Sequence, residues 1–323
     1  MFGLSKEPVR DDPTSAGPLS PLDVLRCGLF GLPGRSNRAY PLRDLGGARP
    51  AHPALEFSFS GLYPRPNRRA WVVRRGLRPS VAATAQLRTG PKSWEIVDLY
   101  VRDGGDSPTP VLEGLARSAA SCEAEAIFLR LPREDPLVDT ARLSGFFPCL
   151  QETLFSRRPD RGAHHNSTPY PPAGVRHKTA VDDHDLFRLY NASTPAEVRH
   201  LAGMTFDRWS SSRERFVCES DEWVFEDCGA IVGWLKRTRR GGITLLGIDV
   251  HPEHGERIGP LLDLGLGDAS TEEVRCLAGA HQTRLGSLLI ERGFDPVAEF
   301  ITLVKRTVVP ARDDSRVRAT IAC

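Results

Sequence analysis

The chain has 323 residues, of which 40% are hydrophobic and 26% charged, with a formal net charge of +2. It is long enough for two domains, each with its own core. Three features are missing: an apolar run of the roughly 20 residues that span a bilayer, an apolar signal-peptide core, and an electrostatic footprint for nucleic acid. We therefore expect a cytoplasmic globular protein that binds neither membranes nor nucleic acid.

The first half of the chain predicts a tail followed by strands and helices. Residues 1–20 are rich in Pro, Ser, Gly and charge, which favours a loose tail. Residues 21–62 predict short helices. Short apolar runs with β-branched residues predict strands at 70–76, 80–87, 94–101, 126–131 and 150–157. Apolar residues at helical spacing predict helices at 110–122 and 136–143.

The second half begins after residues 159–178, which are dense in Pro, Gly, Asn and charge and predict a linker. Asp182 or Asp183 is expected to cap a first helix. Thr194-Pro195 is expected to start a second helix that runs through Trp209. Further elements are strands at 223–225, 230–236, 243–250, 274–278 and 300–305 and a helix at 283–292.

No metal site is predicted. The seven cysteines are an odd number without a C-x-x-C pair, which favours free, mostly buried thiols. His164 and His165 are adjacent in the linker, but such a pair without cysteine or carboxylate support is usually solvated.

The two halves share a pattern of elements in one order. The matching positions, separated by about 150 residues, are Trp71 with Trp223, Val101 with Val250, and Gly145-Phe146 with Gly293-Phe294. A repeat of this length is too long for a solenoid unit and indicates a duplicated domain. We place the domains at 21–158 and 179–310, with a C-terminal tail at 311–323.

The stretch 242–266 predicts an anion site. Ile243 to Val250 is predicted as a buried strand that Pro252 ends. A polar turn with Gly255 and Gly259 follows, and Pro260 is expected at the first position of a helix. The first amides of a helix lack partners within it and carry the positive end of its dipole, so this turn is suited to a phosphate.

This order of elements resembles the GNAT superfamily of acyl-CoA N-acyltransferases. The residues that carry the resemblance are Val250-His251-Pro252-Glu253, Gly255, Ile258-Gly259, Leu261-Leu262 and Gly293-Phe294. It implies an α/β fold (a mixed, mostly antiparallel α+β sheet) in two tandem GNAT-like domains. It also implies acetyl-CoA as co-substrate and an amine, on a small molecule or a protein, as acceptor.

The resemblance implies a cofactor site in the second half. The pyrophosphate would lie at Gly255, Arg257, Ile258 and Gly259. The pantetheine arm would follow Ile248 and Val250 and face Gln282, although a polar helix start explains that glutamine equally well. The family turn is Arg/Gln-x-x-Gly-x-Gly/Ala, and only its last glycine is kept. Arg257, in a glycine slot, either blocks the backbone or adds a charge-assisted phosphate contact.

The first half is not expected to bind the cofactor, because Asp103 and Asp106 in the equivalent turn would repel a phosphate. We expect a structural or substrate-shaping role for this half.

The family's catalytic groups are missing from their usual places. Leu289 stands where the family commonly has a tyrosine acid, and Thr244 where some members have a glutamate base. Asp249 and His281 are the candidate catalytic residues, with a surface carboxylate and a buried structural histidine as the alternatives.

Two functions therefore remain. The first is an N-acetyltransferase that transfers the acetyl group to an amine by direct attack. The second is a catalytically silent relative that binds a ligand or partner. The oligomeric state is left open.

Overall fold

The computed structural model describes residues 14–34, 36–47, 66–159, 171–203, 205–214, 220–267 and 272–307. Each predicted strand and helix of the first half at 70–157 is found, with bounds that differ by a few residues. The strands are β1 (Thr14–Pro18), β2 (Arg68–Arg75), β3 (Arg78–Leu87), β4 (Ser93–Val101), β5 (Ala126–Pro132) and β6 (Phe147–Arg157). The helices are α1 (Pro21–Phe30), α2 (Leu42–Leu45), α4 (Thr109–Ser121) and α5 (Leu137–Leu143).

The second half has more elements than its pattern predicts, and four of its five predicted strands are longer than expected. The strands are β7 (Val175–His177), β8 (Ser220–Asp227), β9 (Ala230–Arg240), β10 (Ile243–Val250), β11 (Glu273–Gly279) and β12 (Asp295–Arg306). The α-helices are α6 (Asp183–Ser193), α7 (Ala196–Ala202), α8 (Phe206–Ser212), α9 (Ile258–Leu266) and α10 (Thr283–Glu291). Two 3-10 helices, η1 (Ala180–Asp182) and η2 (Pro252–Arg257), precede α6 and α9.

Three expectations about local structure need correction. Residues 14–18, predicted as tail, pair antiparallel with β2 as the edge strand β1. Residues 175–177, predicted as linker, pair with β8. The single helix expected from Thr194 through Trp209 is two helices, because the chain turns at Gly203. A Cβ on Gly203 would lie 2.9 Å from the Trp209 backbone, so the corner needs a glycine.

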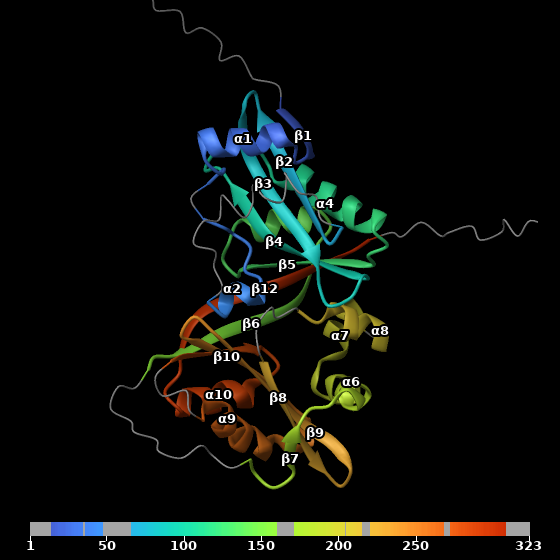
Figure 1. The fold of residues 1–323 in the computed structure, drawn as a ribbon, viewed down its shortest axis with the longest axis vertical. Coiled ribbons are helices and arrows are strands. Elements are labelled where there is room, and N and C mark those ends of the chain that lie inside the picture. Colours follow the sequence, from blue (N-terminus) through green and yellow to red (C-terminus); the bar gives the residue numbers. More distant parts are fainter. Residues whose placement is uncertain are drawn as a thin grey trace, which may run out of the picture.

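All twelve strands in the described residues form one mixed sheet, in the order β1-β2-β3-β4-β5-β12-β6-β11-β10-β9-β8-β7. The halves exchange their last strands. β12, from the end of the chain, lies between β5 and β6, and β6, from the first half, lies between β12 and β11. Figure 1 shows β5, β12 and β6 crossing the middle of the molecule, between the two halves. The sheet therefore continues across the predicted domain boundary at 158.

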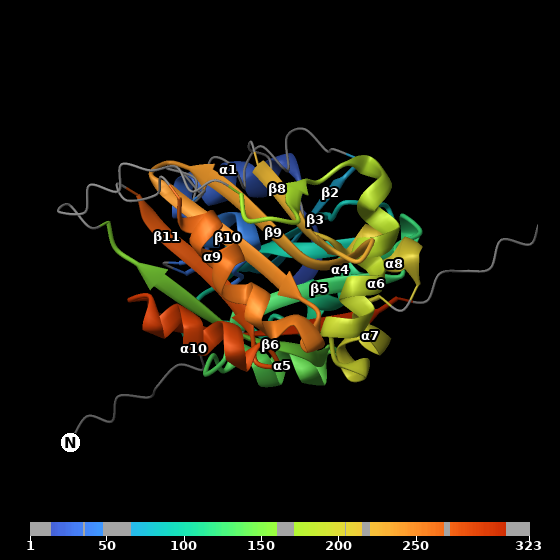
Figure 2. The same cartoon turned by 90° about the horizontal axis from the view of Figure 1, so that it is seen from below.

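Helices cover both faces of the second-half strands. α9 packs its leucines, including Leu261, against Leu235 and Leu246, while α6 packs against Trp234 and Ile231. Successive side chains of a strand point to opposite faces, so α9 and α6 lie on opposite sides of β9 and β10. Figure 2 shows α9 and α10 on one side of these strands and α6, α7 and α8 on the other.

Buried charges tie the halves together at the centre of the sheet. The Arg130 guanidinium on β5 is 2.8 Å from the Glu152 carboxylate on β6 and 2.6 Å from that of Glu214, which follows α8. Burial would raise the pKa of Glu214, but the guanidinium groups of Arg130 and Arg88 outweigh it and lower that pKa. Each charge in the cluster has a buried partner of opposite sign, which offsets the cost of burying it.

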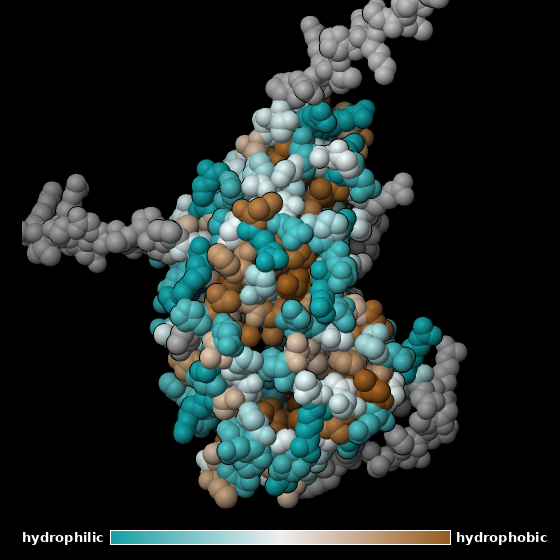
Figure 3. Space-filling model, turned by 180° about the vertical axis from the view of Figure 1, so that it is seen from behind, coloured by the Kyte–Doolittle hydropathy of each residue, from teal (hydrophilic) through white to brown (hydrophobic). Residues whose placement is uncertain are grey.

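The outer surface carries scattered hydrophobic residues. Figure 3 shows them as separate patches broken up by hydrophilic residues on the face behind Figure 1. None of the helices in the described part of the chain is long and apolar enough to cross a bilayer.

Candidate functional site

The site begins where two parallel strands separate. β10 pairs with β11 only from Ile243 with Glu273 to Leu246 with Cys276. Beyond this point β10 runs on to Val250 and β11 to Gly279 without a shared ladder. A cavity of about 140 Å³ lies at the opening, and we call it the splay cavity. The two strands therefore separate beyond Leu246 and Cys276.

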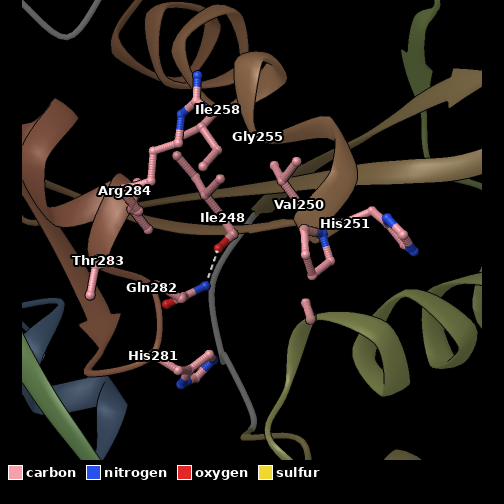
Figure 4. A pocket seen from close by; sticks show the side chains of 12 residues that line it. Ile248, Val250, His251, Gly255, Ile258, His281, Gln282, Thr283 and Arg284 are labelled. Atoms are coloured by element: carbon pink, nitrogen blue, oxygen red, sulfur yellow. Dashed lines mark hydrogen bonds between the residues drawn. The ribbon is translucent and has the colours of Figure 1, made fainter.

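The splay cavity brings together six of the nine residues that the sequence singled out. Figure 4 shows them around one space, from β10, η2, the start of α9 and the segment before α10. These six are Ile248, Val250, Gly255, Ile258, His281 and Gln282. Arg257, Gly259 and Asp249 are not part of its lining. Whether any of the nine binds a cofactor stays a prediction.

The turn after β10 differs from the predicted glycine loop. Residues 252–257 form η2, whose i→i+3 bonds use amides within the turn. The Ile258 amide, for example, donates to the Gly255 carbonyl oxygen. Neither Gly255 nor Gly259 has a positive φ. α9 starts at Ile258, so Pro260 lies in its first turn and supplies no amide. Fewer backbone donors are therefore free for an anion than the sequence predicts.

Arg257 points away from the splay cavity. Its guanidinium lies 4.7 Å from the centre of the Phe225 ring and 3.3 Å from the Glu256 carboxylate. In this position the side chain does not line the cavity, and its effect on a bound phosphate stays a prediction.

A different arginine faces the turn. Arg284, in the first turn of α10, lines the splay cavity, and a Cβ on Gly255 would lie only 2.9 Å from its guanidinium. Gly255 thus leaves room for this cation. Within the described residues, the Arg284 guanidinium has no ion-pair partner. Sequence reasoning missed it because no pattern links residue 284 to residue 255.

Gln282 bridges the opening between the strands. Its side-chain nitrogen donates to the Ile248 carbonyl oxygen at 2.9 Å and to the Asp249 carboxyl at 3.0 Å. Its side-chain oxygen accepts a hydrogen bond from the Gly279 amide at 2.9 Å. The amide group therefore satisfies backbone groups on β10 and β11 that the missing ladder leaves free.

Asp249 lies on the other face of β10. It lines a second cavity of about 130 Å³, which we call the aromatic cavity, together with Leu186, Leu189, Tyr190, Trp209, Arg213 and Trp234. The residue is partly exposed to this cavity, and burial raises the pKa of its carboxyl to about 7. Through Gln282 this carboxyl is connected to the splay cavity. A carboxyl with such a pKa is poised to exchange protons near neutral pH.

Two more groups face the splay cavity. Burial lowers the pKa of His281, although Glu152 partly opposes this, so the neutral imidazole is favoured. The Ser193 hydroxyl oxygen, at the end of α6, is buried and has no hydrogen-bond partner among the described residues. Ser193 was not predicted, because the fold alone brings the end of α6 to β10.

The residues at the family's usual acid and base positions do not supply an acid or a base to the site. Leu289 is fully buried in the core beneath α10. The Thr244 hydroxyl donates to the Glu272 carboxylate at the far end of β10. Neither residue reaches the splay cavity.

No group of three or more ligating side chains in the described residues could hold a metal ion. The described cysteines are Cys27, Cys122, Cys149, Cys228 and Cys276, and all are free. Cys27, Cys149 and Cys276 are buried. His164, His165, Cys218 and Cys323 lie outside the described residues.

Comparison with known proteins finds no matching family model and no matching curated protein. Solved structures do match. A GCN5-related N-acetyltransferase from Sphaerobacter thermophilus is 15% identical, with a TM-score of 0.51 over 91% of this chain and 95% of that chain. A tandem GNAT protein from the clavulanic acid biosynthesis pathway is 16% identical, with a TM-score of 0.46 over 91% and 98%. Saccharomyces cerevisiae N-myristoyltransferase is 15% identical, with a TM-score of 0.47 over 94% and 80%. The sheet and the first of these likenesses confirm the predicted fold: the chain has the mixed α/β fold of that GCN5-related N-acetyltransferase.

Proposed function

We propose that the protein transfers an acetyl group from acetyl-CoA to an amine by direct attack. The observation that carries the proposal is the separation of β10 from β11 with the Asp249 carboxyl beside the gap. The fold supports an acyl-CoA N-acyltransferase in general; the acetyl group and the reaction are the proposed part.

The splay cavity suits the thioester end of the donor. At about 140 Å³ it holds a small group and not a whole coenzyme, whose remainder would lie along the turn outside. Arg284 lies beside that turn, has no ion-pair partner among the described residues, and suits a phosphate through charge-assisted hydrogen bonds. The unpaired Ser193 hydroxyl is a donor for the thioester carbonyl oxygen as negative charge develops on it.

Asp249 is the proposed base. It accepts a proton from the acceptor ammonium, and the neutral amine then attacks the thioester carbonyl carbon. The new C–N bond forms, the C–S bond breaks, and the thiolate leaves with the electron pair of that bond. Asp249 returns the first proton to the thiolate, and its freed carboxylate accepts the second proton that the nitrogen loses as the amide forms. Asp249 then releases this proton to solvent, so protons and charge balance.

A second candidate, a catalytically silent ligand- or partner-binding protein, is favoured by one observation. Gln282 already occupies the backbone groups that the separated strands expose, and η2 uses several amides of the turn. A donor arm would have to displace the glutamine amide to reach the Ile248 carbonyl.

Titration with acetyl-CoA separates the two candidates. A ligand that binds only the folded state raises the melting temperature. At a ligand concentration of 100 times its Kd, the folded state is stabilised by about 2.7 kcal/mol. We expect stabilisation of the full chain by millimolar acetyl-CoA. Arg284→Ala should weaken it about tenfold or more, whereas Arg142→Ala, an exposed arginine on α5, should leave it unchanged. No stabilisation of the parent protein would overturn the acyltransferase proposal and leave the silent one.

A further inference from the structure

The aromatic cavity combines three rings, two leucines and one carboxyl. Tyr190 comes from α6, Trp209 from α8 and Trp234 from β9. Their rings are held by neighbours: Trp209 is 6.2 Å from Tyr190 between ring centres, and the Trp234 ring nitrogen donates to the Glu222 carboxylate at 3.1 Å. The walls are thus pre-formed, which lowers the entropic cost of binding.

The polar groups at this cavity are few. Asp249 is the carboxyl in its lining. The Arg213 guanidinium lies 5.1 Å from the centre of the Trp209 ring and within 4 Å of the carboxylates of Asp183 and Glu222, so its charge is largely balanced. Burial raises the pKa of Tyr190, which keeps its hydroxyl protonated. A cation directed at Asp249 therefore meets one carboxylate and aromatic side chains, and both kinds of group attract cations.

The size of the cavity limits what else the ligand carries. It measures about 130 Å³, and in another protein an apolar cavity of about 150 Å³ holds one benzene molecule. A ring or a short branched alkyl group fits, whereas a long polar chain would leave its hydrogen-bonding groups unpaired among apolar walls.

We propose that the aromatic cavity binds the acceptor, and that this acceptor is a small primary amine bearing one apolar group about the size of a single ring. The inference rests on the proposed acyltransferase function and names its substrate class. The ammonium group lies against Asp249, whose carboxyl accepts a hydrogen bond from Gln282 of the splay cavity, and the apolar group lies between Trp209 and Trp234. An amine held there is on the side of β10 opposite the donor and reaches the thioester through the gap beside Gln282.

Three probes of the intact chain test this without any acetyl-CoA. Phenethylamine carries both required groups, 2-phenylethanol replaces the ammonium by a hydroxyl, and putrescine keeps ammonium groups on a linear chain. By calorimetric titration, we expect phenethylamine to bind about tenfold or more tightly than either of the others. Equal binding of putrescine, or no binding of phenethylamine at millimolar concentration, would overturn the inference.

Substitutions locate the ammonium group. Asp249→Asn should remove the preference for phenethylamine over 2-phenylethanol. Asp221→Asn, which alters a carboxylate paired with Arg237 on the neighbouring strands, should keep it. A preference that survives Asp249→Asn would count against the assigned site. If that variant does not fold, the ranking of the three probes on the parent protein still decides.

The tests of this inference and of the proposed function can fail independently of each other. If acetyl-CoA stabilises the protein but phenethylamine does not bind, the acyltransferase proposal stands and this acceptor class is wrong. If phenethylamine binds with the expected ranking but acetyl-CoA does not, transfer is overturned along with the acceptor role, and the cavity is an amine-binding site. If both bind, release of free thiol from acetyl-CoA should depend on phenethylamine and not on putrescine.

Discussion

The buried carboxyl of Asp249 makes the stability of this protein depend on pH in a direction that can be calculated. Its pKa is about 7 in the folded chain, against an ordinary value of 3.8. Between these two values the unfolded chain has released the proton and the folded chain still holds it, so the free energy of unfolding falls as pH rises and levels off above the higher pKa. The gap corresponds to an upper limit of about 4 kcal/mol, of which about 3 kcal/mol is lost between pH 5 and pH 8.

Asp249→Asn should abolish this loss. The amide is neutral at every pH and can still accept the hydrogen bond from Gln282, so the variant should gain about 3 kcal/mol relative to the parent between about pH 5 and pH 8. Urea unfolding of both proteins at pH 5 and pH 8 gives the change in free energy of unfolding with pH for each protein. The difference between these two changes isolates residue 249, because the contributions of the other titrating groups are the same in both proteins. Asp221→Asn is the matched control and should show no such gain. A parent and variant that respond alike to pH would refute the reasoning about burial.

Further predictions concern activity and packing. If Asp249 is the base, its replacement by Asn should lower kcat/KM by about 10²- to 10⁴-fold, and the parent rate should rise with an apparent pKa near 7. Gly114→Ala on α4 should destabilise by about 1–3 kcal/mol, because its Cβ would overlap the Trp71 ring, whereas Gly28→Ala on α1 meets no atoms and should stabilise by up to about 1 kcal/mol in the same urea titrations. The two halves should not fold separately, because each lacks the strand that the other supplies. We expect neither fragment, residues 1–159 or residues 171–323, to unfold cooperatively when expressed alone, and we expect co-expression to restore one cooperative transition. Cooperative unfolding of the fragment 171–323 alone would contradict the exchanged strands.

Much of the fold could be predicted because buried strands and helices leave periodic apolar patterns. β10 is found at its predicted bounds of Ile243–Val250, since an apolar run and Pro252 mark both its ends. β1 and β7 were missed because edge strands with exposed side chains carry no such pattern. The exchange of β6 and β12 could not be predicted, because the pattern of a strand says which face is buried and not which strand pairs with it.

The sequence could predict only those parts of the candidate site that lie close together along the chain. Ile248 and Val250 share the face of β10 that opens into the splay cavity, which strand periodicity indicates. Asp249, between them, therefore points to the opposite face, where its burial depends on α6 and α8. Arg284 and Ser193 come from helices that only the tertiary fold brings to the turn. The start of α9 was misplaced because residues 252–257 form a 3-10 helix where a loop was expected.

The strand exchange gives the first half a physical part in keeping the site open. β11 pairs with β6 along its length, from Val274 with Arg157 to Gly279 with Glu152, but with β10 over only four residues. Closing the gap would require β11 to bend away from β6 and lose backbone hydrogen bonds, each worth about 1 kcal/mol. β6 is in turn fixed between β11 and β12, and Glu152 on β6 is held by the buried Arg130 of β5. The splay cavity of the second half is therefore braced by a strand from the first, which gives that half a structural role even without a cofactor of its own.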